Sequence, residues 1–499
     1  MDITLGFIKS IKNDNKVCLE IYSQLYKYFE ESLNSYPLEI NLTGIFFIDI
    51  LKLLTGSTLR HREIQQDSII DRSRLKESLS SWPYIGYGDL IHGVDVRNKN
   101  FGRELGLSES VFSRKVLSLL SNIISKSDFN LSFTRFDYEK FLTASSYKYR
   151  FNVSWVNDLQ WEPSIPDINE QIKGLQCCIE KISENTKLPL DSDIYANLLD
   201  KHVRAIVKEK DHTKLDNLNL LVCGSGSELI NRLIGACALQ NNIPVINIAH
   251  GESFGLLDNP IFGIGEQLFS SAILGYGKCY SNNVDNYLFS YPGEKRSTYI
   301  SGSSSIINKI YTKGKKYRHN FNCNKIFYFP TSLRGSQHRY GPYQDCSDYE
   351  YLEWQKKMLQ IFENKLFIKA HPKEKYLYLF ETVHDKYISK KFLDIIDDVD
   401  VFVFDYISTA FCIAAATNKP IIYFNIGIQN IEKEAYKAIK KRALTFDVTD
   451  EFDISYDEII EQLKQTHIDH TVIESYSLDD DREDRATKLL FYIINNYLK

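Results

Sequence analysis

Short apolar runs alternate with amphipathic stretches from residue 218 onward. The runs LNLLVCG (218–224) and IPVINIAHG (243–251) flank a stretch typical of a helix, and further runs follow at 272–277 and 298–303. Short apolar runs separated by helical stretches are typical of parallel strands covered on both faces. The pattern predicts a Rossmann-like βαβ core over 218–305, whose loops follow the carboxyl ends of the strands, where open α/β sheets bind ligands.

A second α/β series begins near residue 325. Its apolar runs and helical stretches alternate at 325–332, 349–363, 365–372, 399–405, 408–418 and 419–425. This alternation predicts a second Rossmann-like lobe over 325–479, followed by a terminal helix over 480–499 that crosses back onto the first lobe. The polar, basic stretch 309–324 predicts a linker between the lobes.

The first 200 residues give a less regular pattern. Amphipathic segments such as 17–32 and 111–125 indicate that helices dominate there. We therefore expect an N-terminal lobe over 1–308, in which 1–200 form a largely helical elaboration of the core. The aromatic and glycine-rich stretch 80–93 is typical of a loop.

Length, charge and cysteine usage narrow the class of protein. A chain of 499 residues exceeds what one core normally holds, which favours two lobes. A net charge of −5 argues against a nucleic-acid partner. The nine cysteines lack paired CxxC spacing, and the chain has neither a signal-peptide pattern nor an apolar run of membrane-spanning length. We expect a cytoplasmic protein, with peripheral docking at the inner face of the membrane left open.

Two motifs follow strands of the second lobe. KAHPKE contains His371 and Pro372, and DYISTAF contains Ser408 and Thr409 at the predicted start of a helix. An imidazole held by the following proline can donate to a phosphate oxygen, and hydroxyls at a helix start favour an anion. Taken singly, Ser408 is also explained as a helix N-cap and His371 as a turn residue. Together the two motifs predict a phosphate site.

This combination of an HP motif and a Ser/Thr pair resembles the bacterial sialyltransferases and polysialyltransferases of GT-B fold. The layout over 218–446 also resembles capsule Kdo transferases and CDP-glycerol glycerophosphotransferases. The resemblance implies two Rossmann-like lobes facing a central cleft and a cytidine-nucleotide donor. It also implies that His371, Ser408 and Thr409 contact the donor phosphate.

The segment IAHGESFG (248–255) resembles the HG segment of the glycerophosphotransferases and related capsule enzymes. This resemblance implies that His250 deprotonates the acceptor hydroxyl, with Glu252 as an equal alternative, because transfer with inversion needs a base near the nucleophile. Asp89 is a weaker acidic candidate. The paired acidic motif of the polysialyl enzymes has no clean copy here, which leaves the donor sugar open.

Two further motifs follow predicted strands, one in each lobe. Ser332 and Arg334 follow the first strand of the second lobe, where a guanidinium could neutralise a donor carboxylate or diphosphate, although most arginines are simply solvent-exposed. His338 and Arg339 are alternatives. The loop GSGSELI (224–230) lacks a full dinucleotide fingerprint and is interpreted as a tight turn that contributes backbone to the cleft.

No metal or other cofactor is expected. Asp398 and Asp400 have the DxD spacing of some metal-dependent transferases, but they precede their strand and so belong to the opposite edge of the sheet. A solvated turn explains them better. We find no His, Cys and Asp cluster with metal-ligand spacing in the sequence.

The sequence therefore favours an inverting, metal-independent glycosyltransferase that moves a sugar from CMP-Kdo, or from a donor like CMP-sialic acid, to a bacterial surface polysaccharide. The acceptor would be a glycan or a lipid-linked glycan. One alternative keeps the fold and transfers a polyol phosphate from a CDP-polyol. Another is a non-catalytic subunit of a polysaccharide assembly complex that binds nucleotide or glycan.

Overall fold

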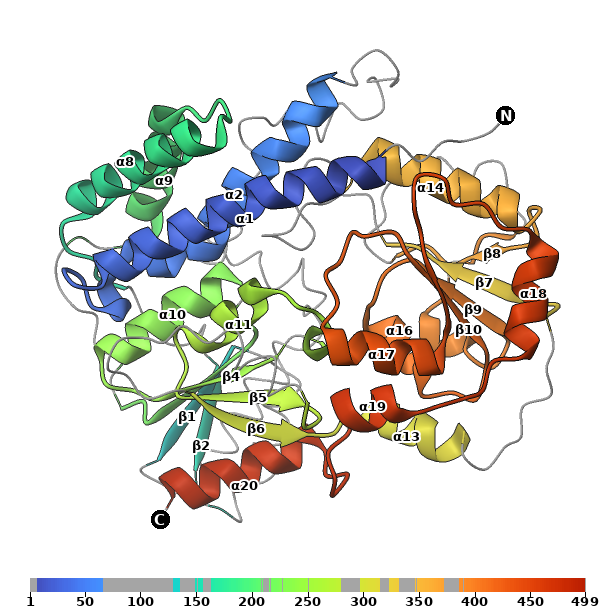
Figure 1. Ribbon diagram of the computed structural model, residues 1–499. Coiled ribbons are helices and arrows are strands. Elements are labelled where there is room, and N and C mark those ends of the chain that lie inside the picture. Colours follow the sequence, from blue (N-terminus) through green and yellow to red (C-terminus); the bar gives the residue numbers. More distant parts are fainter. Residues whose placement is uncertain are drawn as a thin grey trace.

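The computed structural model contains two parallel β-sheets with helices packed on them (Figure 1). It describes residues 7–65, 129–134, 149, 151–155, 163–207, 209, 215, 217–226, 228–249, 251–279, 297–314, 323–331, 346, 348–371, 386–388 and 390–498. The prediction of an α/β protein with parallel strands is confirmed, and the arrangement is consistent with a Rossmann-like fold. We call the N-terminal sheet with its helices the first lobe and the C-terminal sheet with its helices the second lobe.

The first lobe has six described strands in the order β2-β1-β3-β4-β5-β6. Their bounds are β1 Asn130–Phe133, β2 Asn152–Trp155, β3 Leu220–Cys223, β4 Val245–Ile248, β5 Ala272–Tyr276 and β6 Thr298–Gly302. Side chains alternate between the two faces, so that Leu221 packs beneath helix α10 (Leu229–Gln240) and Val222 packs with α20 (Arg485–Tyr497). The last helix of the chain therefore covers the first lobe (Figure 1).

The second lobe has five described strands in the order β11-β10-β9-β7-β8. They are β7 Ile326–Phe329, β8 Phe367–Ile368, β9 Val401–Phe404, β10 Ile421–Asn425 and β11 Leu444–Asp447. Helices α14 (Asp348–Ile361) and α18 (Tyr456–Lys464) pack on one face, and α16 (Thr409–Ala415) and α17 (Lys433–Arg442) pack on the other. Both faces of this sheet are buried, which is why its strands are almost continuously apolar.

Two strands of the first sheet come from the region where helices were expected to dominate. Strands β1 and β2 have the sequences NLSF and NVSW, and β1 pairs in parallel with β3. The core sheet thus begins well before residue 218. Four-residue strands that are half polar give no clear periodicity, so the sequence pattern did not distinguish them from loops.

The expected linker over 309–324 is also different in the structure. Helix α13 (Ser305–Gly314) occupies its beginning, and Ile307 and Tyr311 of this helix are buried in the core of the second lobe. Lys309 and Lys313 lie on this helix, and its other face is apolar. A basic composition therefore concealed an amphipathic helix.

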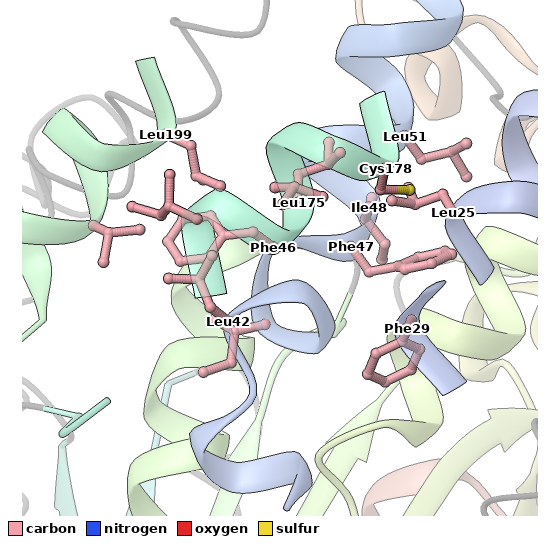
Figure 2. Close-up of a cluster of buried hydrophobic side chains, with 14 of the residues drawn as sticks. Leu25, Phe29, Leu42, Phe46, Phe47, Ile48, Leu51, Leu175, Cys178 and Leu199 are labelled. Carbon is pink, nitrogen blue, oxygen red and sulfur yellow. The ribbon is translucent and has the colours of Figure 1, made fainter. Parts of the chain in front are cut away.

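The N-terminal helices form a separate layer on the first lobe. Their bounds are α1 Phe7–Ser32, α2 Leu42–Gln65, α8 Ile168–Thr186 and α9 Ser192–Ile206. Figure 2 shows part of the apolar cluster that joins them, including Leu25, Phe47 and Leu175. Helix α1 also reaches the second lobe, because Ile11 near its start is buried in the core that contains α14 (Figure 1).

A buried ion pair ties this helical layer to the first sheet. Arg232 of α10 pairs with Asp49 of α2, and its guanidinium also donates to the carbonyl oxygens of Ile45 (2.8 Å) and Gly226 (2.7 Å). Because Arg232 is completely buried, these partners are what makes its charge tolerable there.

The remaining described helices are short. They are η1 Leu38–Ile40, η3 Phe254–Leu256, α11 Pro260–Gln267, α15 Phe392–Ile395 and α19 Thr471–Tyr476. Across the described part of the chain, no helix combines the length and the apolar character needed to cross a membrane.

Candidate functional site

The strand order of the second lobe indicates which edge of its sheet would bind a ligand, and we call this edge, beyond the carboxyl ends of β7 and β9, the crevice. Strands β7 and β9 are neighbours, whereas the chain leaves β7 towards β8 on one side and leaves β9 towards β10 on the other. Helices α14 and α16, which follow these two strands, cover opposite faces. In open α/β sheets this reversal point is where ligands bind, beyond the carboxyl ends of the strands. The residues placed there are those directly after β7 and β9.

A buried carboxylate fixes these two strand ends against each other. Asp405, directly after β9, accepts hydrogen bonds from Tyr328 of β7, from Tyr351 (2.8 Å) and from the indole of Trp354 (3.0 Å). Tyr351 in turn accepts from the amide of Thr331, two residues after the end of β7 (2.8 Å). Burial and the nearby Asp405 charge raise the pKa of Tyr351 well above its usual value, which keeps the hydroxyl protonated as a donor.

Ser408 and Thr409 stand at this edge of the sheet. Ser408 is the N-cap of α16 and accepts from the amide of Phe411 (3.4 Å). This is the N-cap role that the sequence offered as an alternative to phosphate binding. Thr409 is exposed, and Ser408 is partly exposed. Helix α16 has only seven residues, so we assign little weight to its dipole. The Ser408 hydroxyl is the group that could donate to a ligand here, because the Thr409 hydroxyl donates to Glu252.

Glu252 connects the two lobes. It follows β4 of the first lobe, is 8% exposed, and accepts from Ser304 through Oε1 (2.9 Å) and from Thr409 through Oε2 (3.0 Å). Gly251 lies just as close, because a Cβ there would be 3.2 Å from the Thr409 hydroxyl. The segment expected to hold the base and the pair expected to hold phosphate are therefore in direct contact.

A short backbone pairing continues this contact. Leu257 and Ile431 form an antiparallel bridge, flanked by hydrogen bonds from Asp258 N to Asn430 O (2.8 Å) and from Glu432 N to Leu256 O (3.0 Å). We call residues 256–258 with 430–432 the interlobe bridge. Burial, followed by the charge of Glu432, raises the pKa of Asp258. The interlobe bridge joins the loop after β4 to the loop after β10.

His371 follows β8, the edge strand beside β7, and is partly exposed. Lys369, two residues earlier, donates to the Ala370 carbonyl oxygen (2.7 Å), and burial lowers the pKa of its ammonium group. One strand, β7, separates this end of β8 from the end of β9. His371 and Ser408 thus flank the crevice from opposite sides.

The glycine-rich loop of the first lobe has a different role from a phosphate loop. Its Gly226 amide donates to the buried carboxylate of Glu266 (3.2 Å), Ser225 donates to the same group (2.5 Å), and the Gly224 amide donates to Thr134 (2.7 Å). Burial is the main cause that raises the pKa of Glu266 to about 7. A protein carboxyl group already occupies donors that a phosphate would need.

Asp398 and Asp400 lie at the amino end of β9, where Asp400 accepts from the amide of Lys325 (2.9 Å). Both aspartates therefore lie at the edge of the sheet opposite to the crevice. The hydrogen bond of Asp400 stabilises a turn there. Within the ranges that the structure covers, no group of three or more potential metal ligands is found.

Several candidate residues lie outside the described residues. They are Asp89, His250, Ser332, Arg334, His338, Arg339 and Pro372. Their positions in the sequence still assign them to particular loops: His250 directly follows Ala249 at the end of β4, and Ser332 directly follows Thr331.

Sequence reasoning missed the residues that hold the site in place. Asp405 was part of the DYISTAF motif but was not assigned a role, and neither Glu266 nor Gln429 was considered. A carboxylate at the end of an apolar strand, as in VFVFD, is a usable signal for Asp405. Glu266 and Gln429 give no such signal, because their partners are distant in sequence. Glu266 bonds Ser225 and Gly226, and Gln429 bonds the backbone of Ile407.

Comparison of the chain with protein-family models and with curated protein sequences gives no match.

Proposed function

We propose that the protein is a metal-independent glycosyltransferase of GT-B type that takes its sugar from a cytidine nucleotide. The observation that carries the proposal is the contact of Gly251 and Glu252 with Thr409. It brings the end of a first-lobe strand to the crevice of the second lobe. A transferase needs this arrangement, because donor and acceptor must meet between groups from both lobes.

The second lobe is the better candidate for the donor. Its crevice offers the Ser408 hydroxyl, flanked by His371 and Lys369, and Arg334 follows β7 in sequence. A phosphate would have to replace Glu252 to reach the Thr409 hydroxyl. In the first lobe, by contrast, Glu266 occupies donors of the glycine-rich loop. A nucleotide phosphate would therefore meet cationic and hydroxyl groups in the second lobe and a carboxyl group in the first.

We assign the base role to His250 and a connecting role to Glu252. Both oxygens of Glu252 already accept hydroxyl hydrogen bonds, and the residue is buried. A base must have a lone pair free at the acceptor hydroxyl, within about 2.6 to 3.2 Å. Glu252 would give up the contact with Thr409 to meet this requirement. We therefore assign the base role to His250, which follows the same strand, as the family resemblance implies.

The proposal includes inversion at the anomeric carbon. His250 would take the acceptor proton as the acceptor oxygen forms a bond to that carbon, and the nucleotide phosphate would leave with the bonding electron pair. The donor sugar, resembling Kdo or sialic acid, and a surface-glycan or lipid-linked acceptor are part of the proposal on the strength of the family resemblance. A cytoplasmic location, at or near the inner face of the membrane, follows from the same reasoning.

Nucleotide binding tests the proposal. The full chain is heated with CMP, CDP, UDP, GDP or ADP, and the melting temperature is recorded, since a ligand that binds only the folded state raises it. We expect selective stabilisation by CMP or CDP that is lost in His371→Ala. As a control, Lys313→Ala changes a lysine of α13 that pairs with Asp397 at the surface, and it should leave the nucleotide response unchanged.

Other outcomes would redirect the assignment. Stabilisation by UDP or GDP alone would retain a nucleotide-dependent transferase and remove the cytidine donor. Sugar transfer from a CMP-sugar and polyol-phosphate transfer from a CDP-polyol both release CMP, so incubation with the donors themselves separates these two reactions. A folded protein that responds to no nucleotide would contradict the proposal and favour a glycan-binding subunit.

A further inference from the structure

We propose that Gln429 is a positioning residue that holds the Ser408–Thr409 turn in its ligand-binding conformation. This inference rests on the proposed function, because it assigns Gln429 to the nucleotide site. Gln429 lies in the loop after β10 and is not adjacent in sequence to any residue of the site. It touches the turn through Ile407, the residue directly before Ser408.

The contact is a pair of hydrogen bonds between one side chain and the backbone N–H and C=O groups of one residue. The Ile407 amide donates to Oε1 of Gln429 (2.5 Å), and Nε2 of Gln429 donates to the Ile407 carbonyl oxygen (3.0 Å). Gln429 is 6% exposed and Ile407 is 1% exposed, so water does not compete for these groups. The side-chain amide thus replaces a neighbouring strand at the point where β9 has ended.

Only a side-chain amide of this length satisfies both groups of Ile407. A glutamate could accept from the amide, but its second oxygen would face the Ile407 carbonyl oxygen, which has no proton to donate. A leucine would leave a buried donor and a buried acceptor without partners. Either change should free the backbone between Asp405 and Ser408, while the Asp405 hydrogen bonds continue to hold the end of β9.

The loop that carries Gln429 also carries half of the interlobe bridge. Asn430 donates through Nδ2 to Asp258 (2.9 Å), and Glu432 donates from its amide to Leu256 O. Gln429 therefore connects the Ser408–Thr409 turn to residues 430–432, which pair with residues 256–258 in the interlobe bridge. The orientation of Ser408 and Thr409 is in this way linked to the contact between the lobes.

The test compares Gln429→Leu with Gln171→Leu in the full chain. Gln171 is a matched control, because it is 4% exposed and likewise bonds backbone groups, accepting from Leu42 N (2.8 Å) and donating to Pro166 O (2.9 Å). It lies in the helical layer, away from the crevice. Both variants lose one buried side-chain amide. A difference in their effects on the Ser408–Thr409 turn would therefore depend on where the glutamine lies, not on the loss of an amide as such.

Two quantities are measured. In Gln429→Leu, hydrogen exchange of the peptide covering 405–411 should become about tenfold faster, and the Kd for CMP should rise about tenfold. Gln171→Leu should change neither, although its melting temperature falls. The CMP measurement serves as the readout that a purely structural role would not move.

Each other outcome decides the question. Unchanged exchange over 405–411 in Gln429→Leu, or an equal increase in Gln171→Leu, would overturn the positioning role. Faster exchange with an unchanged Kd for CMP would show that Gln429 only stabilises the loop. A wild-type protein that binds no CMP would overturn the proposed function, and this inference with it.

Discussion

At the scale of single residues, the Thr409 hydroxyl has two possible partners, a ligand and the buried Glu252. Thr409→Val keeps the shape of the side chain and removes the donor to Oε2 of Glu252. A buried carboxylate that loses a hydrogen bond is destabilising, here by about 1.5 to 3 kcal/mol. We expect this loss in urea unfolding of Thr409→Val and almost none in Thr409→Ser, which keeps the hydroxyl. Equal stability of all three proteins would show that the bond does not form in solution.

Glu266 makes a prediction about pH. Burial raises its pKa from 4.5 to about 7, so in this range the unfolded chain releases a proton that the folded chain retains. The stability contributed by the neutral carboxyl is complete below pH 4.5, falls as the pH rises towards 7, and is lost above that. The total change is about 3 kcal/mol, at about 1.4 kcal/mol per pKa unit.

Glu266→Gln tests this account. The amide cannot ionise, so the free energy of unfolding of the variant should lack this decline, and its difference from the wild type should vary between pH 5 and pH 8. Chemical denaturation at each pH measures that difference. A difference that is independent of pH would contradict a titrating carboxyl group beneath the glycine-rich loop.

At the scale of elements, the ion pair of Asp49 with Arg232 joins α2 to α10. Asp49→Ala leaves a buried guanidinium without its counter-charge and should reduce the free energy of unfolding by about 3 to 5 kcal/mol. The double variant Asp49→Leu with Arg232→Met removes both charges and should recover part of that loss. Recovery is incomplete because the carbonyl oxygens of Ile45 and Gly226 lose their donor. Urea unfolding compares the three proteins.

Helix α20 contributes a second prediction at this scale. Ile493 is completely buried against the first sheet, whereas Phe491 on the same helix is 44% exposed. Ile493→Ala should destabilise the protein by about 2 to 5 kcal/mol, and Phe491→Ala should have little effect. Similar losses in thermal unfolding for both variants would contradict the packing of this helix on the first lobe.

The elements also show what the sequence could predict. Strands β3, β4, β7, β9 and β10 are buried on both faces, so their apolar runs were found. Strands β1 and β2 are short and half polar, so the sequence pattern did not reveal them within a region expected to be mostly helical. Helix α13 carries a basic face, so its second half was interpreted as part of a linker. These segments owe their structure to partners distant in sequence, which no local pattern records.

The candidate site divides in the same way. His371, Ser408, Thr409 and Glu252 belong to short motifs at strand ends, and the sequence located them. Gln429 and Glu266 instead form hydrogen bonds with groups that are distant in sequence. Gln429 bonds the backbone N–H and C=O of Ile407, and Glu266 bonds the side chain of Ser225. Which residues contact each other across the lobes, as Glu252 and Thr409 do, depends on the packing of the two sheets and could not be predicted.

At the scale of the whole molecule, several described segments join the two lobes. Helix α1 enters the core of the second lobe through Ile11, α20 returns the chain to the first lobe, and the interlobe bridge lies beside Glu252. The contact between Glu252 and Thr409 is thus supported on several sides. Under the proposed function, a donor bound by the second lobe and an acceptor bound by the first would meet at this contact.

The most direct test of this account is the release of nucleotide from candidate donors. The full chain is incubated with CMP-sialic acid, CMP-Kdo or CDP-glycerol and a glycan acceptor, with a metal chelator present, and free CMP is measured. We predict acceptor-dependent CMP release from one CMP-sugar that is lost in both His371→Ala and His250→Ala. Folded protein that releases no CMP from any of these donors, or that does so only with a divalent metal, would contradict a metal-independent, cytidine-dependent transferase.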